Sequence, residues 1–304
     1  MMDFTGWLGD SYRNVRSDGW KGLRQSIWPA YRKIIEQGRR FQPAGDNIYD
    51  YEWDLLIVVD ACRLDLMQEV EPEYSYISDV SSHWSLDSTT ALWMERTFKS
   101  RDTSETTYIC SNPFSDERLD AASFSEFQEV WKDIWVDPGT VPPRPVTDAT
   151  IDSMRNNRSS RTITHYLQPH CPFIPRPELS AGKKRESFSD QDHRDVWELY
   201  RDGDIEVDDL WDGYRSNLEL VLDEIELLLN NVTAEKIVIT SDHGNALGKL
   251  GIYGHPPRMP HHSLREVPWI ETTAEDSGEH TPETEFEDPV NMDREEQLRA
   301  LGYF

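Results

Sequence analysis

Several residues in this sequence have side chains that bind metal ions, and each ends or follows a short apolar run. They are Asp60, His165, His170, Asp242 and His243. A carboxylate at the end of a buried apolar segment is costly unless a positive charge compensates it. Two carboxylates with an adjacent imidazole indicate a divalent-cation site, and mixed oxygen and nitrogen ligands favour Zn²⁺ or Mn²⁺ over Mg²⁺ or Ca²⁺. A lone Asp there is equally typical of a cap or turn, whereas Asp-His-Gly after an apolar run is more specific.

The elements that must position these residues are apolar runs that alternate with helical patterns. Strands are predicted over 54–60, 107–110, 161–167 and 236–240, and helices over 88–98 and 210–229. This alternation predicts an α/β fold with a doubly wound, mainly parallel sheet and helices on both faces. Ligands bind outside the carboxyl ends of such strands, where the polar residues stand. The connecting segments are expected to be a Pro-rich turn at 142–145, a polar surface excursion over 176–208 and an acidic loop over 271–288.

Longer stretches of the sequence resemble sulfatase-like members of the alkaline phosphatase superfamily. The stretch Thr240-Ser-Asp-His-Gly-Asn-Ala-Leu-Gly248 is similar to a sulfatase-type segment of that group. Further stretches that match in the family's order are 165–172, 253–255, 264–269 and 296–303. The resemblance extends over residues 50–304. It implies that 41–304 form one alkaline phosphatase-like catalytic domain with an abbreviated C-terminal subdomain.

The resemblance also implies a reaction, the metal-assisted attack of a hydroxyl nucleophile on a phosphate or sulfate ester. The nucleophile is expected at a helix N-terminus, where free N–H groups favour a bound anion. Thr90 is the first candidate, with Thr89 and Ser88 behind it, although Ser and Thr are also favoured there simply as helix caps. The implied metal ligands are Asp60, Thr90, Asp242 and His243.

The remaining site residues are assigned by the same resemblance. His170 and His255 are expected to contact the ester oxygens as catalytic groups. Arg63, His165 and Lys249 are the expected substrate-binding residues, Arg63 through its bidentate fork. Three of these residues also have a non-functional interpretation. Arg63 would form a surface ion pair, Lys249 would be solvated, and His255 would have its hydrogen bonds made within a loop.

Two departures from the family pattern bear on the reaction. None of the three cysteines begins the sulfatase motif Cys-x-Pro-x-Arg, whose Cys becomes formylglycine. Asp60 is followed by Ala61, where many sulfatases have a second aspartate. Both departures favour a phosphate mono- or diester as substrate, with hydrolysis or transfer open. The alternatives are a sulfate-ester hydrolase without formylglycine, a phosphotransferase that moves a head group onto a glycan or lipid, and a non-catalytic binding member.

The charge of the chain limits its partners. Among 304 residues, 57 are Asp or Glu and 31 are Lys or Arg, which gives a net charge of −26. This disfavours nucleic-acid binding, which needs clustered cations. An acidic excess with few lysines is typical of salt-loving organisms, where salt screens the repulsion. The expected partner is a small-molecule, glycan-linked or lipid-linked phosphate or sulfate ester.

Residues 1–40 differ from the rest because basic residues outnumber acidic ones there. Trp20, Leu23, Ile27 and Tyr31 recur at helical spacing, which predicts a basic amphipathic helix. The helix either packs on the domain or lies on a membrane surface or a partner. No apolar run approaches the roughly 18 residues of a membrane span, and the first 20 residues lack the apolar stretch of a leader. A cytoplasmic location is therefore expected, with a membrane-peripheral one as the alternative.

Overall fold

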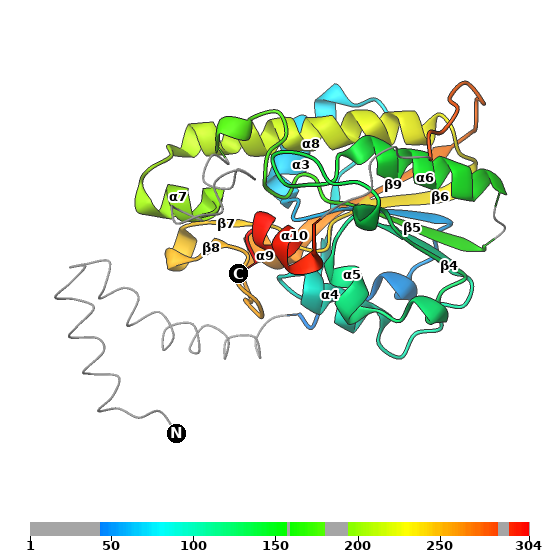
Figure 1. The fold of residues 1–304 in the computed structure, drawn as a ribbon, viewed down its shortest axis with the longest axis horizontal. Helices are drawn as coiled ribbons and strands as arrows, with labels where there is room; N and C mark the ends of the chain where they lie inside the picture. The colour runs from blue at the N-terminus through cyan, green and yellow to red at the C-terminus, as the bar shows by residue number, and fades with distance from the viewer. Residues whose placement is uncertain (1–42, 157–158, 180–193, 285–291, 304) are drawn as a thin grey trace.

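The computed structural model describes residues 43–156, 159–179, 194–284 and 292–303, so the amphipathic helix predicted within 1–40 lies outside the described residues. The described residues form a seven-stranded sheet flanked by helices (Figure 1). Its strands are β1 (Leu55–Val59), β2 (Ser81–Trp84), β3 (Thr106–Cys110), β4 (Glu126–Glu129), β5 (Arg161–Tyr166), β6 (Ala234–Thr240) and β9 (Glu266–Ala274). A small second sheet pairs β7 (Ala246–Leu247) with β8 (Tyr253–Gly254).

The large sheet is mostly parallel, as the sequence predicts. Its strand order is β2-β9-β6-β1-β5-β3-β4. The pairs β6·β1, β1·β5, β5·β3 and β3·β4 are parallel, and β9 runs antiparallel to both β6 and β2. All five residues of the central strand β1 are buried, which is typical of a parallel strand covered on both faces.

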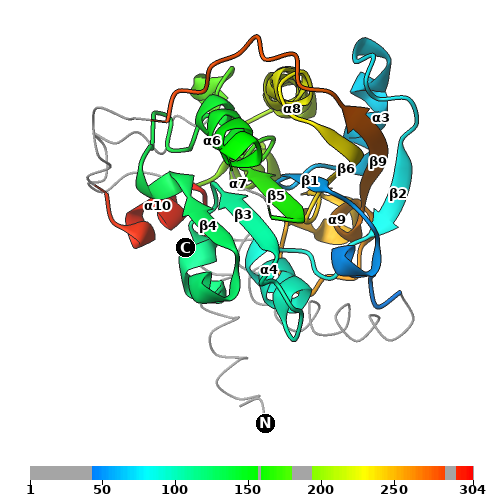
Figure 2. The ribbon, with the colours of Figure 1, turned by 90° about the vertical axis from the view of Figure 1, so that its right-hand side faces the viewer.

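Helices cover both faces of the sheet. The described helices are α3 (Leu64–Val70), α4 (Thr90–Phe98), α5 (Phe114–Arg118), α6 (Pro143–Asn156), α7 (Val196–Asp202), α8 (Val207–Leu229), α9 (His262–Arg265) and α10 (Arg294–Ala300). Short 3-10 helices are η2 (Ile48–Asp50), η3 (Glu71–Glu73), η4 (Ala121–Ser123), η5 (Val130–Lys132) and η8 (Lys249–Gly251). In both views α6 and α8 lie on one face and α4 on the other (Figures 1 and 2).

The two cores follow the alternation of side chains along β1. Leu55, Ile57 and Val59 pack into the core under α3, α6 and α8, whereas Leu56 and Val58 pack into the core under α4. The predicted doubly wound α/β architecture is therefore confirmed. Within the described part of the chain, no helix is long and apolar enough to cross a membrane.

Three connecting segments differ from their predictions. The Pro-rich stretch 142–145 is not a turn, because α6 begins at Pro143 and its prolines occupy the first helical turn, where their missing N–H groups have no helical partner to lose. The segment 176–208 is not wholly a surface excursion, since α7 buries Val196 and Trp197. The acidic segment 271–288 begins inside β9, which continues to Ala274.

Candidate metal centre and active site

The strand register brings the predicted metal ligands to one edge of the sheet. Val58 of β1 pairs with His165 of β5 on one side and with Thr240 of β6 on the other. Asp60 therefore leaves β1 beside His165, and Asp242 leaves β6 beside Asp60. Because these three strands are parallel, their carboxyl ends meet at the same edge, as expected for a ligand site in this architecture.

Asp60, Asp242 and His243 form a compact, fully buried cluster. One ligand atom from each lies within 4.8 Å of the others. His243 Nε2 is 3.7 Å from Asp60 Oδ1 and 3.5 Å from Asp242 Oδ2. His243 Nδ1 lies 2.9 Å from the Gly244 carbonyl oxygen, to which it must donate its proton. In the neutral ring the Nε2 lone pair therefore faces the two carboxylates.

Backbone groups hold Asp242 in one orientation. Its Oδ1 accepts hydrogen bonds from the N–H groups of Ala61 (3.0 Å) and His243 (2.9 Å). Its Oδ2 is buried and has no hydrogen-bond partner among the described residues. Ala61 has a φ of 63°, the left-handed region that an alanine rarely adopts, and this turn directs its N–H toward Asp242. Tyr214 fixes the turn by donating a hydrogen bond to the Ala61 carbonyl.

Asp60 is held by side chains instead. Asn112 donates a 2.7 Å hydrogen bond to Asp60 Oδ2 from the loop after β3. The buried His165 places its Nε2 3.9 Å from the same oxygen, and this nitrogen has no hydrogen-bond partner among the described residues. The other ring nitrogen of His165, Nδ1, is 2.8 Å from the Tyr108 hydroxyl. His165 therefore faces the carboxylates at the metal centre.

Burial dominates the electrostatics of this cluster. Burial raises the pKa of Asp60 well above its usual value, and the nearby Asp242 raises it further. Burial also raises the pKa of Asp242, against the effect of His165. Burial lowers the pKa of His243 to about 4, so that ring is neutral near pH 7. Two buried carboxylates with no positive side chain between them require either protons or a cation.

The donor set fits a divalent metal ion. It offers the Nε2 lone pair of His243 and two carboxylates, of which that of Asp242 has an unpartnered Oδ2 among the described residues. The hydroxyl of Thr90 completes it, with its Oγ 3.3 Å from both Asp60 oxygens and 3.2 Å from His243 Nε2. Mixed oxygen and nitrogen donors in a buried pocket are typical of Zn²⁺ and Mn²⁺ sites.

Of the three candidate nucleophiles, only Thr90 has its hydroxyl in recorded contact with the cluster. Thr90 is the first residue of α4 and is fully buried. Thr89 is the N-cap of that helix. The Ser88 hydroxyl donates to the Pro256 carbonyl (2.7 Å) and accepts from the Met259 N–H (3.0 Å), so its bonds hold the neighbouring loop.

A histidine pair lies beside Thr90. His170 Nε2 and His255 Nε2 are 3.1 Å apart, so one of them carries the shared proton. His170 Nδ1 donates to the Cys171 carbonyl at 2.5 Å, which leaves its Nε2 to meet His255. Burial lowers the pKa of His255 well below its usual value, which keeps its ring neutral. The structure brings His170 and His255 together, and their contact with the ester oxygens stays a prediction.

A cavity of about 690 Å³ opens next to this pair. Thr89 and Ala91, the chain neighbours of Thr90, line it together with His255 and Tyr303, whereas the buried Thr90 does not. Its outer walls carry charges of both signs, from Arg118, Arg201, Arg258, Glu117, Asp195 and Glu198. The volume is that of an ordinary small-molecule site.

None of the three predicted substrate-binding residues lines this cavity. Arg63 directs its guanidinium to Asp65 (Nε to Oδ1, 2.8 Å) and to the Asn245 carbonyl (2.6 Å), and it does not line the cavity. Lys249 is exposed on η8, also outside the lining. His165 is fully buried against Asp60. A substrate contact for Arg63, His165 or Lys249 therefore stays a prediction.

Two residues at the site were missed in the sequence. Asn112 was visible only as part of a turn after the strand at 107–110. Tyr303, whose hydroxyl is 3.4 Å from Thr90 Oγ, belongs to the family-like stretch 296–303 but was given no role there. In both cases the residue type was visible and the long-range contact was not.

No family model matches the sequence, and no curated protein sequence matches it either. Solved structures do match. One is the soluble domain of lipooligosaccharide phosphoethanolamine transferase A from Neisseria meningitidis, at 14% identity and a TM-score of 0.48, over 74% of this chain and 77% of that one. The C-terminal periplasmic domain of a phosphoethanolamine transferase from Campylobacter jejuni matches at 17% identity and a TM-score of 0.46, over 73% and 80%. A 2-O GAG sulfatase matches at 11% identity and a TM-score of 0.44, over 72% and 64%.

These matches are to two phosphoethanolamine transferases and a sulfatase, all at low identity. The described architecture is an α/β fold with a mostly parallel seven-stranded sheet. At its carboxyl edge lies a buried Asp-Asp-His group that fits a metal ion.

Proposed function

We propose that this protein is a metal-dependent hydrolase or transferase that acts on phosphate or sulfate esters through Thr90. One observation carries the proposal. The Thr90 hydroxyl is buried at the N-terminus of α4 and contacts Asp60 and His243, two members of the candidate metal group. The hydroxyl therefore has activating partners, and its chain neighbours Thr89 and Ala91 line the substrate-sized cavity.

Asp60, Asp242, His243 and Thr90 would hold the metal ion, which we propose to be Zn²⁺ or Mn²⁺. When bound, the ion lowers the pKa of a ligating hydroxyl and neutralises charge on the transferring group. Asn112 keeps Asp60 in place, and the backbone N–H groups of Ala61 and His243 keep Asp242 in place. Such supporting hydrogen bonds orient ligands and strengthen metal binding.

The chain's own groups then perform the transfer. Free N–H groups at the start of α4 bind the anionic oxygens of the ester, aided by the helix dipole. Thr90 Oγ gives its proton to Asp60, 3.3 Å away. It forms a bond to phosphorus or sulfur while the bond to the alcohol oxygen breaks, and that oxygen takes up a proton from water. His255 lines the cavity and, once its Nε2 turns from His170 toward the substrate, would donate a hydrogen bond to the ester oxygens. A second attack then displaces Thr90. Attack by water gives hydrolysis, and attack by a second alcohol gives transfer.

Phosphate is the preferred substrate group in this proposal. A threonine nucleophile and the missing Cys-x-Pro-x-Arg motif both favour phosphoryl over sulfuryl transfer. The alcohol part would be a small molecule, a glycan or a lipid, because the cavity accepts a group of moderate size. A cytoplasmic or membrane-peripheral location is part of the same proposal.

The test compares Thr90→Ser with Thr90→Ala. Wild type and both variants are loaded with Zn²⁺ or Mn²⁺ and assayed on aryl phosphate monoesters, aryl phosphodiesters and aryl sulfates. We expect Thr90→Ser to retain turnover and Thr90→Ala to lose it by about 10³-fold or more. The control is Lys236→Ala, which changes an exposed side chain near the amino end of β6, outside the cavity lining.

Two results would overturn the proposal. Full activity in Thr90→Ala would remove Thr90 as the nucleophile. A wild type that binds the metal but turns over none of the esters would point to a non-catalytic binding protein. Preference for aryl sulfate over aryl phosphate would instead identify a sulfate-ester hydrolase that works without formylglycine.

A further inference from the structure

Tyr303 lies over the candidate nucleophile although Thr90 is 213 residues away in the sequence. Its hydroxyl is 3.4 Å from Thr90 Oγ. Its ring stacks on His170 (centroids 5.4 Å apart, 22° between planes) and meets His255 edge-on at 5.5 Å. Tyr303 also lines the cavity, so one side chain contacts the nucleophile, the histidine pair and the substrate space.

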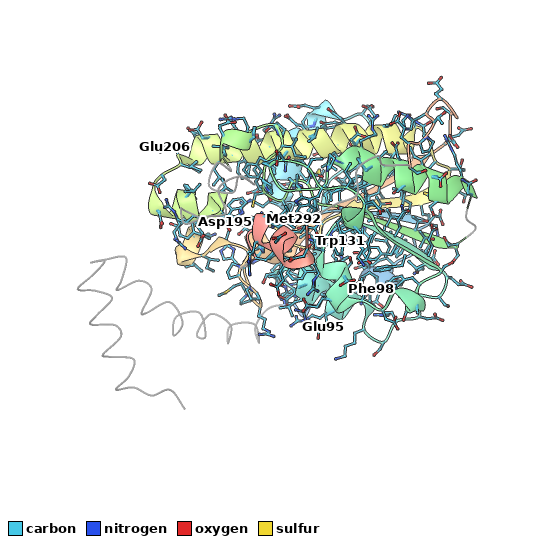
Figure 3. The ribbon with its side chains drawn as sticks, in the orientation of Figure 1. Glu95, Phe98, Trp131, Asp195, Glu206 and Met292 are labelled. Carbon is cyan, nitrogen blue, oxygen red and sulfur yellow. The ribbon has the colours of Figure 1, made fainter. Side chains whose placement is uncertain are left out.

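The segment that carries Tyr303 is firmly anchored. Asp293 and Glu296 form a capping box at the start of α10, and Leu298 is fully buried. Gln297 Nε2 donates a 3.1 Å hydrogen bond to the carbonyl of Trp131, which lies beside α10 (Figure 3). After the helix, Gly302 adopts a φ of 93°. That left-handed turn ends the helix and returns the chain toward the site.

The turn also fixes the backbone of Tyr303 itself. Its N–H donates to the Leu298 carbonyl at 3.1 Å, and its ring contacts Phe114 edge-on at 4.6 Å. The tyrosine is therefore placed by the fold on both its backbone and its ring. A side chain held this way needs little reordering when a substrate binds, which is the property of a preorganised catalytic group.

The hydroxyl explains why a tyrosine is needed at this position. Phenylalanine would supply the same stacking on His170 and the same contact with Phe114. Only the phenol oxygen reaches Thr90 Oγ. The Thr90 hydroxyl has one proton, and Asp60 and His243 are both acceptors within 3.3 Å of it. The Tyr303 O–H therefore donates the hydrogen bond between the two hydroxyls.

We propose that Tyr303 is a catalytic residue that donates a hydrogen bond to the Thr90 nucleophile and to the group being transferred. This inference rests on the proposed function. Before attack, the donated bond stabilises negative charge on Thr90 Oγ. During transfer, the same O–H would lie next to the ester oxygens, because Tyr303 lines the cavity, and it would stabilise charge that develops in the transition state. Tyr303 keeps its own proton throughout, so the balance of the transfer step is unchanged.

The experiment compares Tyr303→Phe with Tyr51→Phe. The first substitution removes the hydroxyl and keeps the ring, and the second removes the hydroxyl of an exposed tyrosine outside the cavity lining. Metal content, melting temperature, kcat and KM are measured on the metal-loaded proteins. We expect Tyr303→Phe to lower kcat by about 10- to 100-fold. We expect KM, metal content and melting temperature to match the wild type, and Tyr51→Phe to be unchanged in all four.

Binding of inorganic vanadate and inorganic phosphate provides a readout that needs no turnover. Vanadate can bond to a hydroxyl nucleophile as a transition-state mimic, whereas phosphate reports ground-state binding. We expect Tyr303→Phe to weaken vanadate binding at least 10-fold and to leave phosphate binding unchanged, both measured by calorimetry. A purely structural role of the ring would change neither, because the ring is retained.

The outcomes separate the two proposals. If the wild type turns over esters or binds vanadate and Tyr303→Phe equals it, the role of Tyr303 is overturned and the proposed function stands. If kcat and KM change together with melting temperature, Tyr303 is structural and the inference is again overturned. If the wild type neither turns over an ester nor binds vanadate, the proposed function fails and the inference fails with it.

Discussion

Replacing Asp242 by Asn separates the two roles that this carboxylate has in the structure. Its Oδ1 accepts hydrogen bonds from two backbone N–H groups, and its Oδ2 has no partner among the described residues. In Asp242→Asn the amide oxygen must take the Oδ1 position, because an NH₂ group cannot accept those bonds. The NH₂ group then occupies the Oδ2 position beside His243, where it offers no lone pair to a cation.

The substitution should have opposite effects on the two forms of the protein. Asp60 and Asp242 have ligand oxygens within 4.8 Å of each other. At an effective dielectric constant of about 20, two unit charges about 5 Å apart repel by about 3 kcal/mol. Removing one charge therefore stabilises the metal-free protein by up to that amount. The metal-loaded form loses a ligand, which costs more than the 10- to 100-fold in affinity typical of losing an outer-shell partner.

The sign of the pH dependence follows from the raised pKa values of Asp60 and Asp242. A carboxyl whose pKa is raised by folding destabilises the protein above that raised pKa, where it is charged, and the cost disappears as the pH falls and the group takes up a proton. The stability gain of metal-free Asp242→Asn is therefore largest at high pH. It shrinks as the pH falls through the raised pKa values.

Thermal unfolding with a chelator and with excess Zn²⁺ or Mn²⁺ measures both effects. We expect a higher melting temperature than wild type with the chelator and little further rise on adding metal, whereas the wild type rises strongly. Asp148→Asn is the matched control. Asp148 lies on α6 and is also buried, but its Oδ1 is 2.6 Å from His280 Nε2 and not at the candidate metal site. This variant should keep the metal-induced rise. An Asp242→Asn variant that loses stability without metal and keeps the full metal-induced rise would refute the assignment.

Three further perturbations test the same site. Metal affinity should fall with falling pH, because protons compete for Asp60 and Asp242; calorimetry in buffers of different ionisation enthalpy should show proton release on binding. Asn112→Ala should weaken metal binding about 10- to 100-fold in a chelator competition and leave the fold intact by circular dichroism. Gly244→Ala should lower stability in urea unfolding by more than 1 kcal/mol, because its Cβ would lie 2.3 Å from the Ser263 carbonyl oxygen.

The grouping of the metal ligands could be predicted because it depends on a simple rule. Asp60 and Asp242 each follow a strand of apolar residues, and parallel strands end at one edge. The strand boundaries were also readable, since Leu55–Val59 and Ala234–Thr240 lie close to the predicted runs. The helix at Thr90 was predicted from its apolar positions and its cluster of capping residues.

Other features depended on context that a sequence does not display. Pro143 was interpreted as part of a turn because proline ends most helices, yet the first helical turn tolerates it. Asn112 looked like an ordinary turn residue, and its bond to Asp60 joins positions 52 residues apart. Arg63 differs, because its partner Asp65 stands two residues along the chain, so the ion pair that occupies its guanidinium had a local signal.

The alternation of side chains along the strands explains why His165 faces the candidate metal centre. Along β1, Val58 packs into the core under α4, and Cys110, which pairs with His165, packs into the same core. Because Val58 also pairs with His165, that side chain must point to the α4 face, where it meets the ring of Trp93 at 5.6 Å. Thr90 begins the helix on that face. His170 lies beyond the end of β5, where no alternation applies, so its contact with His255 depends on the loop and could not be placed by this rule.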